Sequence, residues 1–250
     1  MPRVEARSVS KSIAGKRVLD RVTMTVEGGE VVALVGHNGA GKTTLLRILV
    51  GLEEPDEGRV VVEGRVGYMP ELDYLPLFFT LRDLAVLHGV EPSRLVEALE
   101  DIAPGRGWGR LLDSRLAALS KGMRRLVGLA LLLEGGFDVL VLDEPLSGID
   151  WAARRRVLEA LKAAASKGVA VLATGHAISD FIGRCSRILL MSEGRVTGVI
   201  DGEPRGYVLE VCTSRGCTRR ELDAGVVSRL LSLLGIEGTL YELRVTPGCR

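Results

Sequence analysis

The sequence predicts an α/β fold built around a mainly parallel sheet, and three apolar runs carry this prediction. Val31–Val35, Val139–Leu142 and Val169–Ala173 are continuous apolar segments, which is the pattern of strands covered on both faces. A helical pattern over Trp151–Lys167 separates the last two runs. Strands that alternate with helices are typical of a parallel sheet with helices packed on its faces.

The other elements of the main domain follow from local patterns. Val22–Val26 alternates apolar and polar residues, as a half-buried strand does. A glycine-rich loop leads into a helical pattern over Thr43–Val50. From about Thr80 to Leu133 the pattern is mostly helical, which predicts a helical insert.

We therefore expect a main domain at 1–200 that contains a helical subdomain at about 72–134. The remaining segment, 201–250, predicts a small C-terminal extension with a strand, a helix and a second strand. These three elements are expected over Tyr207–Cys212, Thr218–Leu234 and Thr239–Val245.

The charge balance and the apolar content indicate a globular protein without a nucleic-acid partner. The 250 residues include 33 Lys and Arg and 32 Asp and Glu, which gives a net charge of +1, and 46% are apolar. A nearly neutral chain lacks the overall basic excess of a nucleic-acid binder. There is no Gln, and Asn38 is the only Asn. Because amide side chains are scarce in heat-adapted proteins, this composition predicts a thermophilic source.

No segment has the length of a membrane span. The longest apolar run, Leu126–Leu133, is far short of the about 18 residues that a span requires. The segment Met1–Glu5 carries no apolar signal-peptide core. We therefore expect the protein to be cytoplasmic.

A glycine-rich segment at 36–43, GHNGAGKT, fits the phosphate-loop motif G-x-x-x-x-G-K-[ST]. Glycines let backbone N–H groups curl around phosphate oxygens, and a helix N-terminus adds partial positive charge. Lys42 is expected to reach the β- and γ-phosphates of a bound nucleotide, and the Thr43 hydroxyl to ligate Mg²⁺. The alternative is a glycine turn that only caps a helix. The residues expected to hold the nucleotide are Gly36, Asn38, Gly39, Ala40, Gly41, Lys42, Thr43 and Thr44.

Two carboxylates end the apolar strand at 139–142. Asp143 stands where it would hold Mg²⁺ through water, and Glu144 where it would act as general base on an attacking water. The alternative is an ordinary strand exit with two solvated acids. A phosphate loop in the same chain favours the catalytic interpretation.

Further motifs appear in the order of a known family. The segment 119–125 reads LSKGMRR, the segment 145–150 reads PLSGID, and His176 follows the next predicted strand. Together with the phosphate loop, this order resembles the ATP-binding-cassette (ABC) ATPases from about Val4 to Val199. The resemblance implies a P-loop NTPase fold of the ABC type, with a mixed or parallel sheet core, antiparallel N-terminal strands and a helical insert. It also implies ATP hydrolysis with Mg²⁺ as cofactor.

The resemblance further implies a second ABC ATPase chain, identical or different, in a head-to-tail dimer. ATP held by Lys42 of one chain would be covered by Ser120 and Gly122 of the other. Asp150 would link the two sites, and His176 would contact the γ-phosphate and the attacking water. Ser120 and Asp150 each precede a helical pattern, so each has helix N-capping as an alternative role.

The chain departs from the family pattern at several positions. The family usually stacks adenine on an aromatic ring near the position of Ile13, whereas no aromatic residue precedes Tyr68 in this chain. Such stacking is worth about 1–3 kcal/mol, so we expect weaker nucleotide affinity or poorer base selectivity. Glu71 replaces the usual lid-loop Gln and still offers an oxygen to a cation. In the signature, Lys121 replaces Gly and Met123 replaces Gln.

The segment VGYMPE at 66–71, followed by TLRD at 80–83, resembles the ABC ATPases of drug, sodium or antibiotic exporters. The run YLPLFF at 74–79 either packs in the core or receives an integral membrane transporter subunit. We expect an ATPase subunit held by that partner on the inner face of the cell membrane. The alternative is a soluble, non-transport ABC ATPase, for example of the cofactor-assembly type. The transported substrate and the direction of transport stay open.

Overall fold

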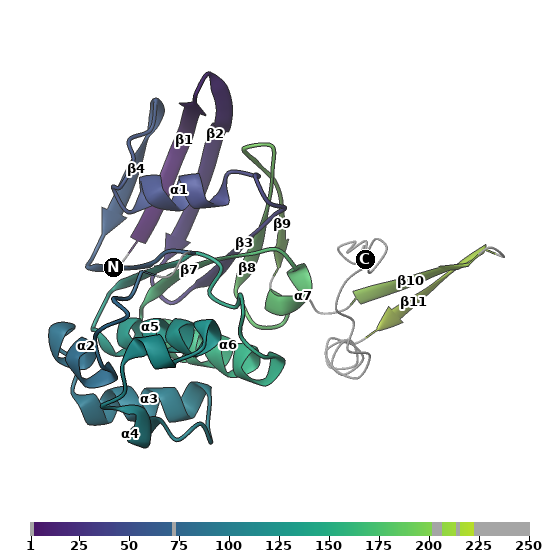
Figure 1. Cartoon of the computed structure of the whole chain (residues 1–250). Helices are drawn as coiled ribbons and strands as arrows, with labels where there is room; N and C mark the ends of the chain where they lie inside the picture. Colours follow the sequence, from purple (N-terminus) through teal and green to yellow (C-terminus); the bar gives the residue numbers. More distant parts are fainter. Residues whose placement is uncertain (1–2, 72–73, 202–206, 214–215, 223–250) are drawn as a thin grey trace.

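The computed structural model describes residues 3–71, 74–201, 207–213 and 216–222, and its central feature is a six-stranded sheet of order β5-β6-β7-β3-β8-β9. Strands β5 to β8 in this order pair in parallel, whereas β9 is antiparallel to β8. The sheet is mixed, as predicted (Figure 1). Its strands are β3 (Val31–Val35), β5 (Val66–Met69), β6 (Val139–Leu142), β7 (Ala170–Gly175), β8 (Arg187–Ser192) and β9 (Arg195–Asp201).

A second, antiparallel sheet is formed by the N-terminal strands in the order β2-β1-β4. The turn between β1 and β2 is Ala14-Gly15, with φ values of 49° and 78°. Two successive positive φ values twist a hairpin in the same sense as its flanking strands. Figure 1 shows helix α1 beside this sheet. The elements are β1 (Arg3–Ile13), β2 (Lys16–Glu27), β4 (Glu57–Glu63) and α1 (Lys42–Leu49).

The described chain between β5 and β6 is mainly helical, and α6 and α7 follow β6 and β7. Trp108 is fully buried among these helices, and its indole N–H donates to the Ala103 carbonyl at 2.8 Å. In the described part of the chain, no helix has the length and apolar content of a membrane span. The helices are α2 (Leu81–Leu87), α3 (Pro92–Ile102), α4 (Trp108–Leu111), the 3-10 turn η1 (Leu116–Ala118), α5 (Lys121–Glu134), α6 (Trp151–Ser166) and α7 (Ile178–Phe181).

The central sheet separates two apolar clusters, and alternate residues of β3 belong to different ones. Val31, Ala33 and Val35 pack with the helices of the α5 and α6 layer. Val32 and Leu34 pack with α1 and the antiparallel sheet. This alternation is expected, because successive side chains of a strand point to opposite faces of the sheet. The continuous apolar run therefore reflects burial on both faces, as the sequence predicts.

The C-terminal extension differs from its prediction. Gly216–Leu222 forms strand β11, which pairs in antiparallel orientation with β10 (Tyr207–Thr213). The beginning of the helix expected over Thr218–Leu234 is therefore a strand. Because β10 offers an in-register backbone partner along this segment, pairing overrides a weak local helical pattern. The rest of that helix and the strand expected over Thr239–Val245 lie outside the described residues.

Candidate functional site

The phosphate loop joins β3 to α1 and places the N-terminus of that helix at the carboxyl end of the sheet. Gly41 has a φ of 102°, and a Cβ on it would lie 2.8 Å from the carbonyl oxygen of Val18. A Cβ on Gly36 would lie 2.2 Å from the carbonyl oxygen of Met191. Neighbouring backbone therefore requires glycine at both positions, and this packing shapes the loop.

The Lys42 side chain points from the first turn of α1 back into the loop and is nearly buried. Its Nζ donates to the carbonyl oxygens of Gly36 at 2.6 Å and His37 at 3.3 Å. The same nitrogen lies 3.5 Å from Oε1 of Glu144. The loop thus holds a cation that faces the acidic strand end, where it is suited to a polyphosphate.

The other predicted loop residues divide between the core and the surface. Asn38 and Gly39 are exposed at the bend of the loop, whereas Ala40 is buried. In the first turn of α1, Thr43 is exposed and Thr44 is half-buried. The Thr43 hydroxyl is therefore accessible to a ligand bound in the loop.

Asp143 and Glu144 follow β6, and Thr174 of β7 connects them. The Thr174 hydroxyl donates to Oδ1 of Asp143 at 2.7 Å and accepts from the backbone N–H of Glu144 at 2.8 Å. Asp143 is fully buried, and no donor among the described residues reaches its Oδ2. A buried carboxylate oxygen of this kind suits a hard cation. Asp143 and the Thr43 hydroxyl therefore fit Mg²⁺.

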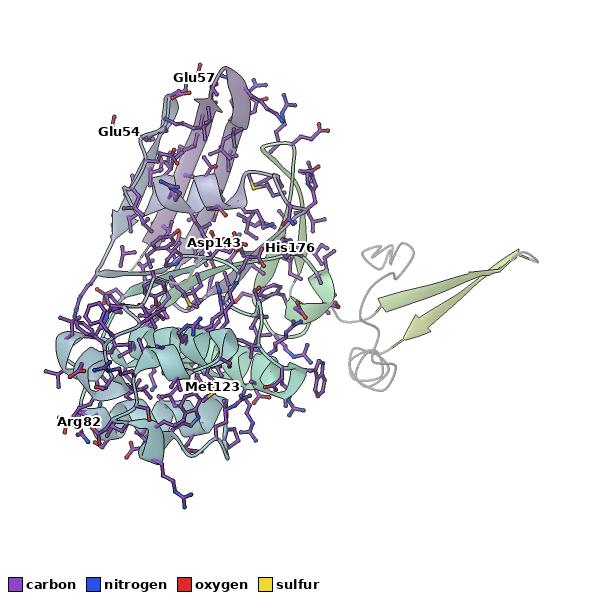
Figure 2. The ribbon with its side chains drawn as sticks, viewed as in Figure 1. Glu54, Glu57, Arg82, Met123, Asp143 and His176 are labelled. Carbon is purple, nitrogen blue, oxygen red and sulfur yellow. The ribbon has the colours of Figure 1, made fainter. Side chains whose placement is uncertain are left out.

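Glu144 lies between two basic groups. Its Oε1 is 3.1 Å from Nε2 of His176, which follows β7, and 3.5 Å from Nζ of Lys42. Burial raises the pKa of Glu144, and the charges of His176 and Lys42 oppose this shift. A raised pKa makes a carboxylate a better proton acceptor. Figure 2 shows Asp143 and His176 at the level of the central sheet.

Two residues at the acidic strand end are not among those that the sequence singled out. Thr174 is the one polar side chain in the strand segment AVLATG. A single polar residue in an apolar strand could have marked it as a candidate site residue. Arg125 of α5 donates to the backbone carbonyl of Asp143 at 2.8 Å. Every residue has a backbone carbonyl, so the sequence alone could not predict that Arg125 binds the one of Asp143.

Ser120 and Gly122 lie at the N-terminus of α5. The Ser120 side chain accepts from the N–H of Met123 at 3.2 Å, so it caps this helix. A Cβ on Gly122 would lie 2.3 Å from the carbonyl oxygen of Gly148. Gly122 therefore allows α5 to press against the loop 145–150. Figure 2 places Met123 among the helices, away from Asp143.

Asp150 also caps a helix in this structure. Its Oδ1 accepts from the N–H of Ala153 at 3.0 Å, and this bond lowers the pKa of Asp150. Its Oδ2 pairs with Arg106, which lies between α3 and α4. Asp150 therefore joins the loop after the acidic pair to the helical layer.

The last two predicted site residues lie at the edge of this arrangement. Ile13 ends β1 and is 43% exposed, so its side chain is open to a ligand. Glu71 follows β5 with an exposed side chain, and its carbonyl oxygen accepts from Arg125 at 2.8 Å. Among the described residues, the ion pairs and hydrogen bonds of the two acidic side chains are with Lys42, His176 and Thr174, and not with Ile13 or Glu71.

Comparisons with known proteins point to one family. Residues 19–147, just over half of the chain, match the ABC transporter family. The chain is 33% identical over 248 residues to the Nod factor export ATP-binding protein I of Sinorhizobium fredii (strain NBRC 101917 / NGR234), covering 93% of this chain and 71% of that protein. The protein of the same description from Burkholderia lata is 33% identical over 221 residues, covering 82% and 72%.

The chain belongs to the ABC transporter family.

Solved ABC structures support the same assignment. The structure of an ATP-binding subunit of an ABC transporter superposes with a TM-score of 0.71 at 28% identity, covering 79% of this chain and 89% of that one. A post-hydrolysis dimer of an ATP-binding cassette bound to ADP and Pi shares the fold, with a TM-score of 0.70 at 20% identity, covering 80% and 99%. The predictions of an ABC fold and of an ATP-hydrolysing transporter subunit are confirmed.

The exposed Ile13 of this ABC ATPase gives a prediction about nucleotide affinity. An Ile13→Tyr protein gains a ring on which adenine can stack, worth about 1–3 kcal/mol. We therefore expect the Kd for ATP to fall about 5- to 150-fold. Titration calorimetry with ATP and GTP measures this change, with Ile13→Leu as the aliphatic control. Unchanged affinity in Ile13→Tyr, with strong preference for ATP in the wild type, would contradict it.

Proposed function

We propose that two such chains enclose two ATP molecules and hydrolyse them to drive export through a separate integral membrane subunit. One observation carries the proposal: Glu144 Oε1 lies 3.5 Å from Nζ of Lys42 and 3.1 Å from Nε2 of His176, although the three residues come from separate segments. A cation, a carboxylate base and an imidazole thus converge at one end of the sheet. A cation, a general base and a group that orients water can together promote hydrolysis of a terminal phosphate.

The phosphate loop takes the triphosphate of ATP in this proposal. Backbone N–H groups at the start of α1 face the phosphates, and Lys42 turns from the loop carbonyls to the β- and γ-phosphate oxygens. Thr43 and Asp143 would hold Mg²⁺, with Glu71 as a further oxygen ligand, and the bound ion would neutralise charge that develops on the phosphate oxygens. The buried Asp143 Oδ2, which receives no hydrogen bond from a described residue, supports this assignment.

Glu144 removes a proton from the attacking water. The water oxygen bonds to the γ-phosphorus, the bond from that phosphorus to the ADP oxygen breaks, and inorganic phosphate leaves. His176 lies beside Glu144 at 3.1 Å and orients the water and the γ-phosphate. Burial raises the pKa of Glu144, and the higher pKa makes its carboxylate a stronger base.

A second chain completes each site. Ser120 and Gly122 lie at the N-terminus of α5, which carries partial positive charge, and Ser120 is exposed. We propose that this helix end covers the ATP bound by the partner's phosphate loop, and that Asp150 contacts the partner near its own site. Capping by Ser120 and Asp150 is compatible with this role, since the Ser120 hydroxyl can still donate its O–H to a phosphate oxygen and a carboxylate accepts more than one hydrogen bond.

The run 74–79 supports contact with a membrane subunit. Leu75 is buried and Phe79 packs against the core, whereas Tyr74, Leu77 and Phe78 are exposed, Phe78 by 68%. We call these three exposed side chains the apolar patch. Exposed aromatic residues are typical of protein interfaces, and the relatives named as export proteins support export. The subunit would then sit on the inner face of the cell membrane.

A Phe78→Glu protein tests the apolar patch. In the wild type, the Phe78 ring packs edge-on against Phe79, with ring centroids 4.7 Å apart, but its side chain is mostly exposed. We therefore expect the substitution to leave folding and the ATPase rate of the purified chain unchanged. Loss of a buried interface aromatic costs about 2–4 kcal/mol, so recovery of the chain with host membranes should fall at least tenfold. Sedimentation of membranes with quantitative blotting measures this recovery.

Val199→Glu is the matched control, because Val199 is also an exposed apolar residue, at 61%, on strand β9. It should sediment with membranes as the wild type does. Equal recovery of Phe78→Glu and wild type would exclude the apolar patch as the docking surface. A wild-type chain that stays entirely in the soluble fraction would favour the soluble, non-transport alternative.

The scarcity of amide residues supports a heat-adapted source for the protein.

A further inference from the structure

The peptide bond between Asp143 and Glu144 is held from both sides. Its N–H donates to the Thr174 hydroxyl at 2.8 Å, and its carbonyl oxygen accepts from Nη2 of Arg125 at 2.8 Å. The N–H of Asp143 donates to the carbonyl oxygen of Met69 at 2.8 Å. Arg125 and Thr174 together therefore fix the plane of the peptide that joins the two acids.

The orientation of this peptide sets the direction of Glu144. The φ of Glu144 is 51°, in the left-handed region that residues other than glycine rarely adopt. Such a conformation persists only where surrounding contacts enforce it. Both contacts are internal, since Arg125 is 5% exposed and Thr174 is 1% exposed. Loss of either one frees the peptide to rotate and Glu144 to turn away from His176.

The other arm of Arg125 holds the lid segment, residues 66–71. Its Nη1 donates to the carbonyl oxygen of Glu71 at 2.8 Å, and Nη2 lies 3.4 Å from that of Pro70. The planar guanidinium directs its N–H groups along fixed, diverging directions. Arg125 is therefore a rigid connection between the lid segment and the peptide of the acidic pair.

We propose that Arg125 is a positioning residue for hydrolysis, which couples the place of the lid segment to the direction of Glu144. The inference rests on the proposed role of Glu144 as the base. In the sequence, two residues separate the end of the lid segment from Tyr74 of the apolar patch, so we expect a displacement of that surface to move the carbonyls of Pro70 and Glu71. Arg125 transmits this movement to the Asp143–Glu144 peptide.

Arg125→Lys in the full chain tests the proposal, because lysine keeps the charge and loses the fork. We expect kcat for ATP hydrolysis to fall about 10- to 100-fold, since a small misplacement of a reacting group has effects of this size. KM for ATP should stay within about threefold, because the phosphate loop is untouched. Arg125→Gln, which is neutral, is expected to show the same loss of kcat. It replaces Arg125→Lys in the test if the buried lysine ammonium prevents folding.

Thr174 gives an independent test of the same peptide. Thr174→Val keeps the shape and removes the hydroxyl, so the Glu144 N–H loses its acceptor. We expect the same loss of kcat with little change in KM. Thr174→Ser retains the hydroxyl and should restore kcat, which a role in packing alone would not explain.

Arg187→Lys is the matched control. Arg187 also donates from Nη2 to a backbone carbonyl, that of Thr25 at 3.0 Å, but it begins β8 at the end of the sheet opposite to the site. Its replacement should lower the melting temperature and leave kcat within about twofold of wild type, because the reacting groups are not displaced. Parallel loss of kcat in Arg125→Lys and Arg187→Lys overturns the proposal, as does a wild-type kcat in Arg125→Lys.

Hydrogen exchange measured by mass spectrometry tests the coupling itself. We expect faster exchange in both 66–71 and 140–145 of Arg125→Lys, and faster exchange in one segment alone contradicts a connection. Glu144→Gln in the same ATPase assay separates the two levels of the argument. Turnover in Glu144→Gln refutes the role of Glu144, whereas an inactive Glu144→Gln with a fully active Arg125→Lys refutes only the role of Arg125.

Discussion

A Glu144→Gln protein is expected to bind ATP as the wild type does and to hydrolyse it about 10²- to 10⁴-fold more slowly. Glutamine nearly reproduces the shape of glutamate, so the contacts of the Glu144 backbone with Thr174 should remain. The amide cannot accept the proton of the attacking water, however, and the rate of the chemical step falls. Steady-state release of phosphate and titration with a fluorescent ATP analogue measure the two properties separately.

The same variant should also report on the second chain. If ATP holds two chains together and hydrolysis releases them, as proposed, Glu144→Gln with Mg²⁺ and ATP should elute as a dimer in size-exclusion chromatography. Glu159→Gln is the control, since Glu159 lies exposed on α6 and pairs with Arg155. It should match the wild type in turnover and elution. Wild-type turnover in Glu144→Gln would falsify the assignment of Glu144 as the base.

A Gly122→Ala protein is expected to lose both stability and turnover. The new Cβ would lie 2.3 Å from the carbonyl oxygen of Gly148, whereas ordinary contacts begin near 3.4 Å. Helix α5 and the loop 145–150 must therefore separate by about 1 Å, and overpacking of this kind costs about 1–3 kcal/mol of unfolding free energy. The N–H of Ser147 donates to the carbonyl of Glu144 at 3.1 Å, so movement of this loop also displaces Glu144.

A displacement near 1 Å at a reacting group lowers turnover about 10²-fold. Urea unfolding and phosphate release measure the two losses in Gly122→Ala. Gly109→Ala is the matched control, because Gly109 is also helical and a Cβ there meets only Val96, at 4.0 Å. It should be as stable as the wild type or more so. Equal behaviour of the two variants would show that the contact of Gly122 with Gly148 has no consequence.

The parts of the fold that depend on local pattern were predictable from sequence. The phosphate loop has its glycines, Lys42 and Thr43 at fixed spacing, and the flanking run at 31–35 is apolar because both faces of β3 are covered. The acidic pair follows another such run. In each case the neighbours in sequence are also the neighbours that determine the structure, so pattern and outcome agree.

The contacts that position these groups were not predictable. Arg125 acts on backbone carbonyls of Glu71 and Asp143, which every residue type possesses. Gly122 is required by the carbonyl of Gly148, a neighbour in space that no spacing rule identifies. Strand β11 replaces the first part of an expected helix because β10 pairs with it. The contacts of Arg125 and Gly122 depend on how segments distant in the sequence meet, whereas β11 depends on pairing with the strand that precedes it, and a single sequence records neither.

The left-handed backbone of Glu144 has a further consequence for how the protein evolves and how it responds to engineering. A φ of 51° at a residue with a Cβ costs about 1–2 kcal/mol relative to a right-handed conformation. Glycine at this position would relieve that strain and remove the carboxylate. Selection for thermostability alone would therefore favour an inactive protein here, so stability and activity act against each other at this residue.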